Sequence, residues 1–377
     1  MGIKDLVRPC VVTIKPYKPG KPISELKREL NLKTVYKMAS NENSLGPSPR
    51  AVAAIKKSLV EINRYPDGES FYLKKALAKK YKLKAENIIV GNGSDELIVL
   101  ALRAFVNKGE EVIVADPTFL IYKLAAKLSD ARIISVPLKA FRYDLASMKA
   151  KITSKTKLIF IANPDNPTGS YVNRIEVENF LKGLPENVIV FFDEAYFEYV
   201  SVKDYPDTMK YLRKGNIIVS RTFSKIYGLG GLRIGWAAAS KEISGYLNQV
   251  REPFNANSLA QAAAEAALED KKHIEKSKKV VREGMRYLTG EFKALKLFFV
   301  PSVTNFILFN AGRKSTAIYQ QLLQKGIIVR EMSGWGLKNF IRVTIGSMKE
   351  NKLFMREFKK LLKKEGPLTF AGSRLIC

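Results

Sequence analysis

Short apolar segments alternate with helical patterns from about residue 41 to residue 248, and this alternation limits the folds open to the chain. Continuous apolar runs are typical of strands buried on both faces, and strands separated by helices form parallel sheets. We therefore predict an α/β fold whose large domain has a mainly parallel seven-stranded sheet covered by helices on both faces. The seven expected strands are residues 87–90, 111–114, 132–136, 158–162, 188–192, 217–220 and 234–238.

A second, smaller α/β domain is expected further along the chain. An alanine-rich helix at 258–269 and a lysine-rich helix near 274–288 lead into it. Apolar segments at 305–309, 326–330 and 340–344 then alternate with helical patterns, which indicates a short sheet with helices of its own.

The first forty residues contain a Pro- and Gly-rich stretch at 16–22, which predicts an extended arm followed by a helix at about 23–30. A chain of 377 residues exceeds the usual size of one domain. We therefore divide the chain into an arm and helix at 1–40, a large domain at 41–250 and a small domain at 251–377, which parts of the arm join.

The composition describes a folded, strongly basic protein. Hydrophobic residues make up 46% of the chain, and the formal net charge is +28. The basic residues are spread over several stretches in which lysine alternates with apolar residues at helical spacing, a pattern typical of solvated helix faces. No zinc-finger spacing and no aromatic-basic RNA-binding motif occurs. We therefore expect no nucleic-acid partner, although the charge could favour anionic, phosphorylated substrates.

Cysteine and histidine usage point to a reducing compartment and no metal. Cys10 and Cys377 are too few for a disulfide framework, and His273 lies alone in a lysine-rich helix. The first residues lack the hydrophobic region of a signal peptide, and the apolar runs are too short to span a bilayer. The expected location is the cytoplasm, with no membrane partner.

Lys225 is the strongest candidate for a catalytic residue. It follows the buried strand 217–220 and lies among small residues and glycines, where a lysine is poorly explained by solvation. A desolvated amine has a lowered pKa, which is what a lysine needs in order to form a Schiff base. Arg233, eight positions later, could hold a phosphate, and Asp193 ends the strand 188–192. A Schiff-base lysine, a phosphate clamp and a strand-end carboxylate are what pyridoxal phosphate needs.

The candidate residues Gly93, Asn166, Asp193 and Lys225 all follow predicted strands. Strand ends of one parallel sheet converge on a single crevice, and ligands of open α/β sheets bind there. We therefore expect these four residues to lie close together.

Other readings of the same motifs have less support. The segment 191–195, Phe-Phe-Asp-Glu-Ala, resembles a Walker B strand, but no Gly-x-x-x-x-Gly-Lys-Ser/Thr loop accompanies it. The segment 91–96 follows a strand and opens a helix, yet Glu96 replaces the third glycine of a dinucleotide fingerprint. The Asn-Pro-Thr-Gly at 166–169 would on its own be an ordinary turn.

Eight segments in order along the chain resemble the class I/II pyridoxal-phosphate aminotransferases of fold type I. The combination of Ser-Asn-Glu-Asn-x-Leu-Gly-Pro, Tyr-Pro-Asp and Gly-Asn-Gly-Ser-Asp-Glu most resembles the histidinol-phosphate aminotransferase branch, which also includes threonine-phosphate decarboxylase and some aromatic aminotransferases. The segments are 38–49, 64–68, 91–96, 116–119, 163–169, 193–196, 220–235 and 340–346.

The resemblance implies a role for each matching residue toward pyridoxal phosphate. Lys225 would bind it covalently, Asp193 would hold the proton on its ring nitrogen, and Phe119 would stack on its ring. Tyr196 and Asn166 would hydrogen-bond its phenolic oxygen. The residues implied in the phosphate cup are Gly93, Ser94, Asp95, Thr222 and Arg233, with Tyr65 reaching in from a neighbouring subunit of a homodimer.

The resemblance also implies the reaction. Lys225 would move a proton during transamination between histidinol phosphate and 2-oxoglutarate, which gives imidazole acetol phosphate and glutamate. Substrate contacts would come from Arg342, Arg330, Asn41 and Tyr17 of the arm. Decarboxylation of threonine phosphate and transamination of aromatic amino acids stay open as alternatives. A regulatory or nucleic-acid-binding protein without cofactor is the alternative from another class.

Overall fold

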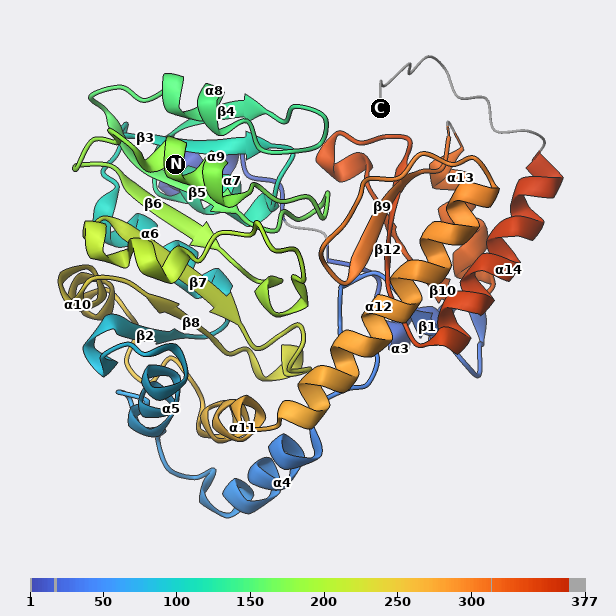
Figure 1. Cartoon of the computed structure of the whole chain (residues 1–377), viewed down its shortest axis with the longest axis horizontal. Helices are drawn as coiled ribbons and strands as arrows, with labels where there is room; N and C mark the ends of the chain where they lie inside the picture. The colour runs from blue at the N-terminus through green and yellow to red at the C-terminus, as the bar shows by residue number, and fades with distance from the viewer. Residues whose placement is uncertain (1, 17–18, 313, 366–377) are drawn as a thin grey trace.

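A computed structural model describes residues 2–16, 19–312 and 314–365 of the chain. Figure 1 shows two lobes, a large one built around a wide sheet and a smaller one built around a short sheet. Helix α12 (Lys271–Ala294), drawn in orange, runs from beside the large lobe into the small one.

The large lobe contains a seven-stranded sheet with the order β2-β8-β7-β6-β5-β3-β4. Every pairing in it is parallel except those of β8, which runs antiparallel to both β2 and β7. The predicted α/β fold with a mainly parallel seven-stranded sheet is therefore confirmed. The strands are β2 (Ile88–Gly91), β3 (Glu111–Asp116), β4 (Arg132–Pro137), β5 (Thr156–Ala162), β6 (Ile189–Asp193), β7 (Ile217–Thr222) and β8 (Gly235–Ala238).

Helices cover both faces of this sheet, which explains why its central strands are buried along their whole length. All five residues of β6 and all six of β7 are buried. Helices α4, α5 and α11 gather beyond the β2–β8 end of the sheet (Figure 1). The helices of this lobe are α4 (Pro49–Ser58), α5 (Phe71–Tyr81), α6 (Ser94–Phe105), α7 (Leu120–Leu128), α8 (Leu145–Ala150), α9 (Arg174–Leu181), α10 (Lys241–Gln249) and α11 (Ser258–Leu268).

The small lobe contains an antiparallel sheet with the order β11-β12-β9. The single strand expected at 326–330 is divided in two: one half pairs in parallel with an N-terminal strand, and the other pairs with β12. The expectation of one strand was wrong because the two halves have different partners. The elements are β1 (Tyr36–Lys37), β9 (Phe306–Asn310), α13 (Ser315–Gln324), β10 (Ile327–Ile328), β11 (Arg330–Glu331), β12 (Phe340–Thr344) and α14 (Met348–Glu365).

The N-terminal segment is more helical than the sequence predicted. The helix α3 (Ile23–Leu30) has the expected bounds, but α1 (Ile3–Leu6) and α2 (Pro9–Val12) each form a turn of helix within the expected extended arm. Arg8, which precedes α2, donates to Leu128 O and to Asp130, so this part of the chain lies against the end of α7.

The apolar cores cross the predicted domain limits. Ala260 of α11 belongs to the same buried cluster as Ala51 of α4, on the large lobe. Met38 packs with Phe292 and Ile307 in the core of the small lobe. The limits at residues 40 and 250 stay a prediction: α11 packs across the limit at 250, and Met38 is a part of the arm that packs with the small lobe.

Candidate active site

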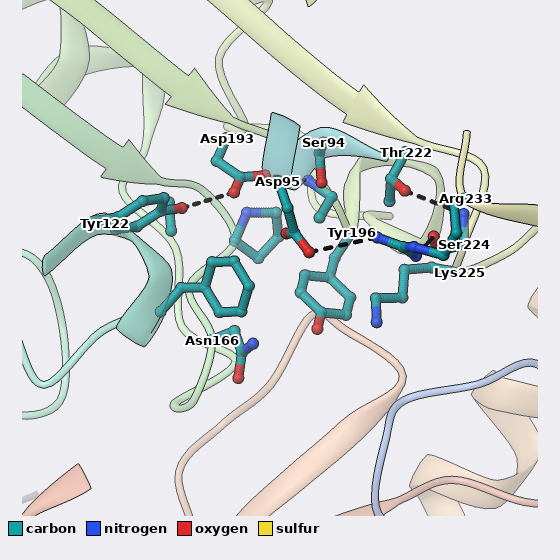
Figure 2. A pocket seen from close by; sticks show the side chains of 14 residues that line it. Ser94, Asp95, Tyr122, Asn166, Asp193, Tyr196, Thr222, Ser224, Lys225 and Arg233 are labelled. Atoms are coloured by element: carbon teal, nitrogen blue, oxygen red, sulfur yellow. Dashed lines mark hydrogen bonds and ion pairs between the residues drawn. The ribbon is translucent and has the colours of Figure 1, made fainter. Parts of the chain in front are cut away.

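A cavity of about 130 Å³ opens where β5, β6 and β7 end (Figure 2). The hydrogen-bond register pairs Ala162 with Asp193 and Asp193 with Ser220, so β5 and β6 end level with one another and β7 continues two residues further, to Thr222. This register is why residues far apart in sequence meet here. The cavity is lined by Ser94, Asp95, Phe119, Tyr122, Ala162, Pro164, Asn166, Asp193, Ala195, Tyr196, Thr222, Ser224, Lys225 and Arg233.

The Lys225 side chain points into this cavity beside the ring of Tyr196 (Figure 2). Its Nζ donates to Ser40 O at 3.3 Å and lies 5.7 Å from the centre of the Tyr196 ring. Burial, aided by the positive charge of Arg342, lowers the pKa of Lys225 from 10.5 to about 8. A much larger fraction of this amine is therefore neutral near pH 7 than for an ordinary lysine, which makes it a better nucleophile.

Asp193, the last residue of β6, is buried at the far side of the cavity. The Tyr122 hydroxyl donates to its Oδ2 at 2.7 Å, and the Ala195 amide donates to its Oδ1 at 3.1 Å. Burial raises the pKa of Asp193 to about 6, so the carboxylate is still mainly ionised at neutral pH. It can accept a charge-assisted hydrogen bond from a protonated ring nitrogen.

The turn between β2 and α6 and the guanidinium of Arg233 form an anion pocket. Gly93 has a φ of +80°, and a Cβ on it would lie 2.5 Å from Arg233 Nη2. Arg233 pairs with Asp95 at 3.3 Å and contacts Ser224 Oγ at 3.4 Å. The first turn of α6 begins here at Ser94, where backbone amides favour a phosphate.

Tyr196 and Asn166 connect this cavity to the small lobe. The Asn41 side-chain amide donates to the Tyr196 hydroxyl at 2.8 Å, so the tyrosine proton is left to donate elsewhere. Burial raises the pKa of Tyr196 to about 12, which keeps this hydroxyl protonated. Asn166 Oδ1 accepts a hydrogen bond from Arg342 of β12.

A second cavity adjoins the first and shares Phe119, Asn166, Tyr196 and Lys225 with it. Its remaining wall is contributed by the N-terminal segment and the small lobe. Arg342 is buried and donates to Ala39 O at 2.8 Å, and the Arg330 guanidinium lies 5.0 Å from the Trp335 ring centre. The lining residues are Gly20, Ala39, Ser40, Asn41, Phe119, Asn166, Tyr196, Lys225, Arg330, Trp335 and Arg342.

Two residues expected at the site are not placed there. Tyr65 lies outside both cavities with 83% of its surface exposed, and its ring stacks on Phe254 at 4.8 Å. Its role as a contribution to a neighbouring subunit stays a prediction. Tyr17 lies outside the described residues.

Nine lining residues of the two cavities were not among the predicted site residues, and three of them show why. Tyr122 lies inside the helix α7, and nothing in the sequence distinguishes it from an aromatic residue of the core. Trp335 comes from a turn before β12, and the sequence gives no signal for it. Ser224 could have been found, because it lies directly before Lys225 and is a small hydroxyl residue on a phosphate-binding turn.

Within the described part of the chain, no cluster of three or more His, Cys, Asp and Glu side chains could hold a metal ion. No helix in that part has both the length and the apolar character needed to cross a membrane.

Comparison with known proteins gives the class to which this fold and site belong. The family model for aminotransferase class I and II matches residues 33–358, so the chain belongs to this family. The resemblance inferred from the eight segments is thereby confirmed.

Within this family, the chain is similar over nearly its whole length to several histidinol-phosphate aminotransferases. A histidinol-phosphate aminotransferase of Moorella thermoacetica is 50% identical over 357 residues, which cover 94% of this chain and 92% of that protein. One from Nitrosococcus oceani is 45% identical over 93% of this chain and 95% of its own length. The crystal structure of the Sinorhizobium meliloti histidinol-phosphate aminotransferase in complex with pyridoxal-5'-phosphate matches with a TM-score of 0.86 and 27% identity, and covers 94% of this chain and 98% of that one.

Proposed function

We propose that this aminotransferase uses pyridoxal phosphate to transfer the amino group of histidinol phosphate to 2-oxoglutarate. The observation that carries the proposal is the place of Lys225, which lines both cavities. On one side are the strand-end carboxylate of Asp193 and the anion pocket at Arg233. On the other side are Arg330 and Arg342 of the small lobe. The histidinol-phosphate aminotransferases among the relatives support the choice of substrate.

The first cavity has the groups that pyridoxal phosphate requires. The Asp193 carboxylate is available to its ring nitrogen, and the Tyr196 hydroxyl to its phenolic oxygen. The φ of +80° and the close Arg233 guanidinium require a residue without a side chain at Gly93, which leaves that turn open to a phosphate. The residues that would hold the phosphate are Gly93, Ser94, Asp95, Thr222, Ser224 and Arg233.

When bound, pyridoxal phosphate supplies an electron sink for the bond broken at the substrate α-carbon. Lys225 would hold the cofactor and would move the proton between the substrate α-carbon and the cofactor C4′. A lysine whose pKa lies near 8 suits this task, because it both gives up and regains a proton near neutral pH. Asp193 would keep the ring nitrogen protonated, and Tyr196 would donate from its own hydroxyl.

The second cavity suits substrates with an anionic end. Arg342 and Arg330 bring two guanidinium groups to one cavity, and guanidinium groups bind phosphate and carboxylate equally well. Histidinol phosphate carries a phosphate, and glutamate carries two carboxylates, so one pocket can accept both partners in turn.

A specific observation favours an aromatic amino acid as a second candidate substrate. The cavity is walled by Trp335 and Phe119, which offer aromatic surface to any planar ring, whether imidazole or phenyl. Decarboxylation of threonine phosphate would use the same anion contacts.

The proposal includes a homodimer in the cytoplasm. Exposed apolar side chains gather on the residues between α4 and α5 and on the first turn of α5, near Phe254, and a second copy of the chain would cover them. A tyrosine exposed on this surface could reach a neighbouring copy's phosphate pocket. The exposed side chains are Leu59, Val60, Ile62, Tyr65, Phe71, Tyr72 and Phe254.

The test is a half-reaction panel on the purified protein loaded with pyridoxal phosphate. Histidinol phosphate, phenylalanine, tyrosine, glutamate and threonine phosphate are mixed with it separately, and the loss of the cofactor's visible absorbance is followed. We expect histidinol phosphate and glutamate to react fastest, without release of carbon dioxide. A much faster reaction of phenylalanine or tyrosine would select the aromatic alternative, and carbon dioxide from threonine phosphate would select decarboxylation.

A further inference from the structure

Glu194 is a fully buried carboxylate directly after Asp193, and its exposed side-chain fraction is 0%. Its Oε2 accepts hydrogen bonds from Arg221 Nε at 2.9 Å and from Arg221 Nη2 at 2.8 Å. Its Oε1 accepts from the Thr208 hydroxyl at 2.6 Å and from the Tyr205 hydroxyl at 3.4 Å. Both carboxylate oxygens of Glu194 therefore accept hydrogen bonds, and none of the residues that donate them lines the first cavity.

Two of the three partners of Glu194 are connected to segments that carry proposed cofactor-binding residues. Arg221 is the residue before Thr222 on β7, four positions before Lys225. The Tyr205 hydroxyl has a single proton, which it shares between Glu194 Oε1 and the carbonyl of Asn163, the residue that begins the turn carrying Asn166. Through these contacts Glu194 ties together the ends of β5, β6 and β7.

Arg221 is held as firmly as its partner. Its side chain is 2% exposed, and its guanidinium lies 3.3 Å from the Phe197 ring centre and 4.9 Å from that of Tyr81. A buried ion pair contributes little net stability compared with an apolar pair of similar size, because both charges must be desolvated. The Glu194–Arg221 ion pair therefore contributes little to global stability. Its more specific effect is to fix the positions of the strand ends relative to one another.

We propose that Glu194 is a positioning residue that keeps Asp193, Asn166 and the Thr222–Lys225 turn in the relative arrangement that pyridoxal phosphate requires. The inference deepens the proposed function and rests on it. Glu194 touches neither cofactor nor substrate. It acts through Arg221 and Tyr205.

Glu111 provides a matched control, because it is a buried glutamate in the same sheet but at the amino ends of the strands. Glu111 is the first residue of β3 and is 3% exposed. It accepts hydrogen bonds from the hydroxyls of Thr153 at 2.6 Å and Thr156 at 3.2 Å, and it pairs with Arg132 at 3.4 Å. Glu111 therefore has the same kinds of partners as Glu194, but at the amino ends of the strands, away from the cavity.

The experiment compares Glu194→Gln and Glu111→Gln with the wild type. For each apoprotein, the Tm is measured by thermal unfolding, and the Kd for pyridoxal phosphate by titration of the visible absorbance. The pH midpoint of that absorbance is then measured on the loaded protein. We expect both variants to lose Tm, because each weakens the contact of a buried carboxylate with its arginine. Only Glu194→Gln should raise the Kd, by about tenfold or more, as loss of an outer-shell partner does at metal sites, and shift the pH midpoint.

Equal Kd and pH midpoint in Glu194→Gln and Glu111→Gln would overturn the positioning role. If Glu194→Gln does not fold, Tyr205→Phe replaces it: this variant keeps the Glu194–Arg221 pair and removes the hydroxyl that links Glu194 to Asn163. It should still weaken cofactor binding several-fold, and an unchanged Kd would count against the inference. A wild-type protein that binds no pyridoxal phosphate would refute the proposed function as well, so the two failures are distinguishable.

Discussion

Arg330 and Arg342 are register partners on the antiparallel strands β11 and β12. Directly opposed residues of an antiparallel pair project from the same face of the sheet, so both guanidinium groups line the cavity that contains Lys225. Two like charges are brought together by the sheet itself, at an energetic cost that an anionic substrate would relieve. Under the proposed function, this pairing would give the small lobe a direct role in selecting substrates.

Replacing Arg342 should therefore damage substrate use more than folding. We expect Arg342→Gln to lower kcat/KM for histidinol phosphate by about 100-fold or more, equivalent to about 3 kcal/mol, because a charge-assisted anion contact is left unpaired. Steady-state kinetics measure the effect. The exposed Arg356 on α14 provides the control, and Arg356→Gln should leave kcat/KM within about twofold of the wild type. Equal losses in both variants would contradict the assignment.

The reactivity of Lys225 should depend on pH in a defined direction. Its pKa is lowered from 10.5 to about 8, so the neutral, nucleophilic amine increases as the pH rises through 8. In the apoprotein, we expect the rate of acylation of Lys225 to rise with a midpoint near pH 8. Mass spectrometry of digests taken at intervals measures that rate. A midpoint near 10.5 would show that burial does not act on this amine as described.

Gly93 and Gly109 form a matched pair for testing the anion pocket. Both have positive φ, +80° and +82°, but a Cβ on Gly109 would meet nothing within 4 Å, whereas one on Gly93 would lie 2.5 Å from Arg233 Nη2. Gly109→Ala should lose about 1–2 kcal/mol of stability from backbone strain, and Gly93→Ala should lose more, because its ψ of 167° is essentially restricted to glycine and its Cβ would meet Arg233. Only Gly93→Ala should also weaken binding of pyridoxal phosphate, measured by absorbance titration. Equal cofactor affinities would argue against a phosphate at this turn.

A shared active site can be tested by mixing two inactive variants. If Tyr65 serves a neighbouring copy, Tyr65→Ala and Lys225→Ala should each have low activity as homodimers. After unfolding and refolding together in equal amounts, half of the dimers are mixed, and each of these has one intact site. About a quarter of the wild-type activity should return. Refolding without any recovery, in a preparation that sedimentation finds dimeric, would exclude a contribution of Tyr65 across the interface.

Local pattern was enough to predict the sheet of the large lobe and the residues at its strand ends. The seven apolar segments became seven strands, and Gly93, Asn166, Asp193 and Lys225 follow strands of that one sheet. The parallel order makes their convergence predictable, because every strand of a parallel set ends at the same edge. Lys225 and Asp193 were recognised from this rule and from the residues around them.

Contacts between distant segments could not be predicted in the same way. The backbone amide of Asn41 donates to the Thr344 hydroxyl 303 positions away, and the Tyr122 hydroxyl donates to Asp193 from within a helix. The strand expected at 326–330 divides between two partner strands. Such contacts depend on how complete elements pack, and no short-range periodicity records that packing. The sequence by itself therefore determined the sheet, the lysine and its carboxylate. The tertiary structure decided which residues of the N-terminal segment and small lobe complete the site, because only packing of the two lobes brings them to Lys225.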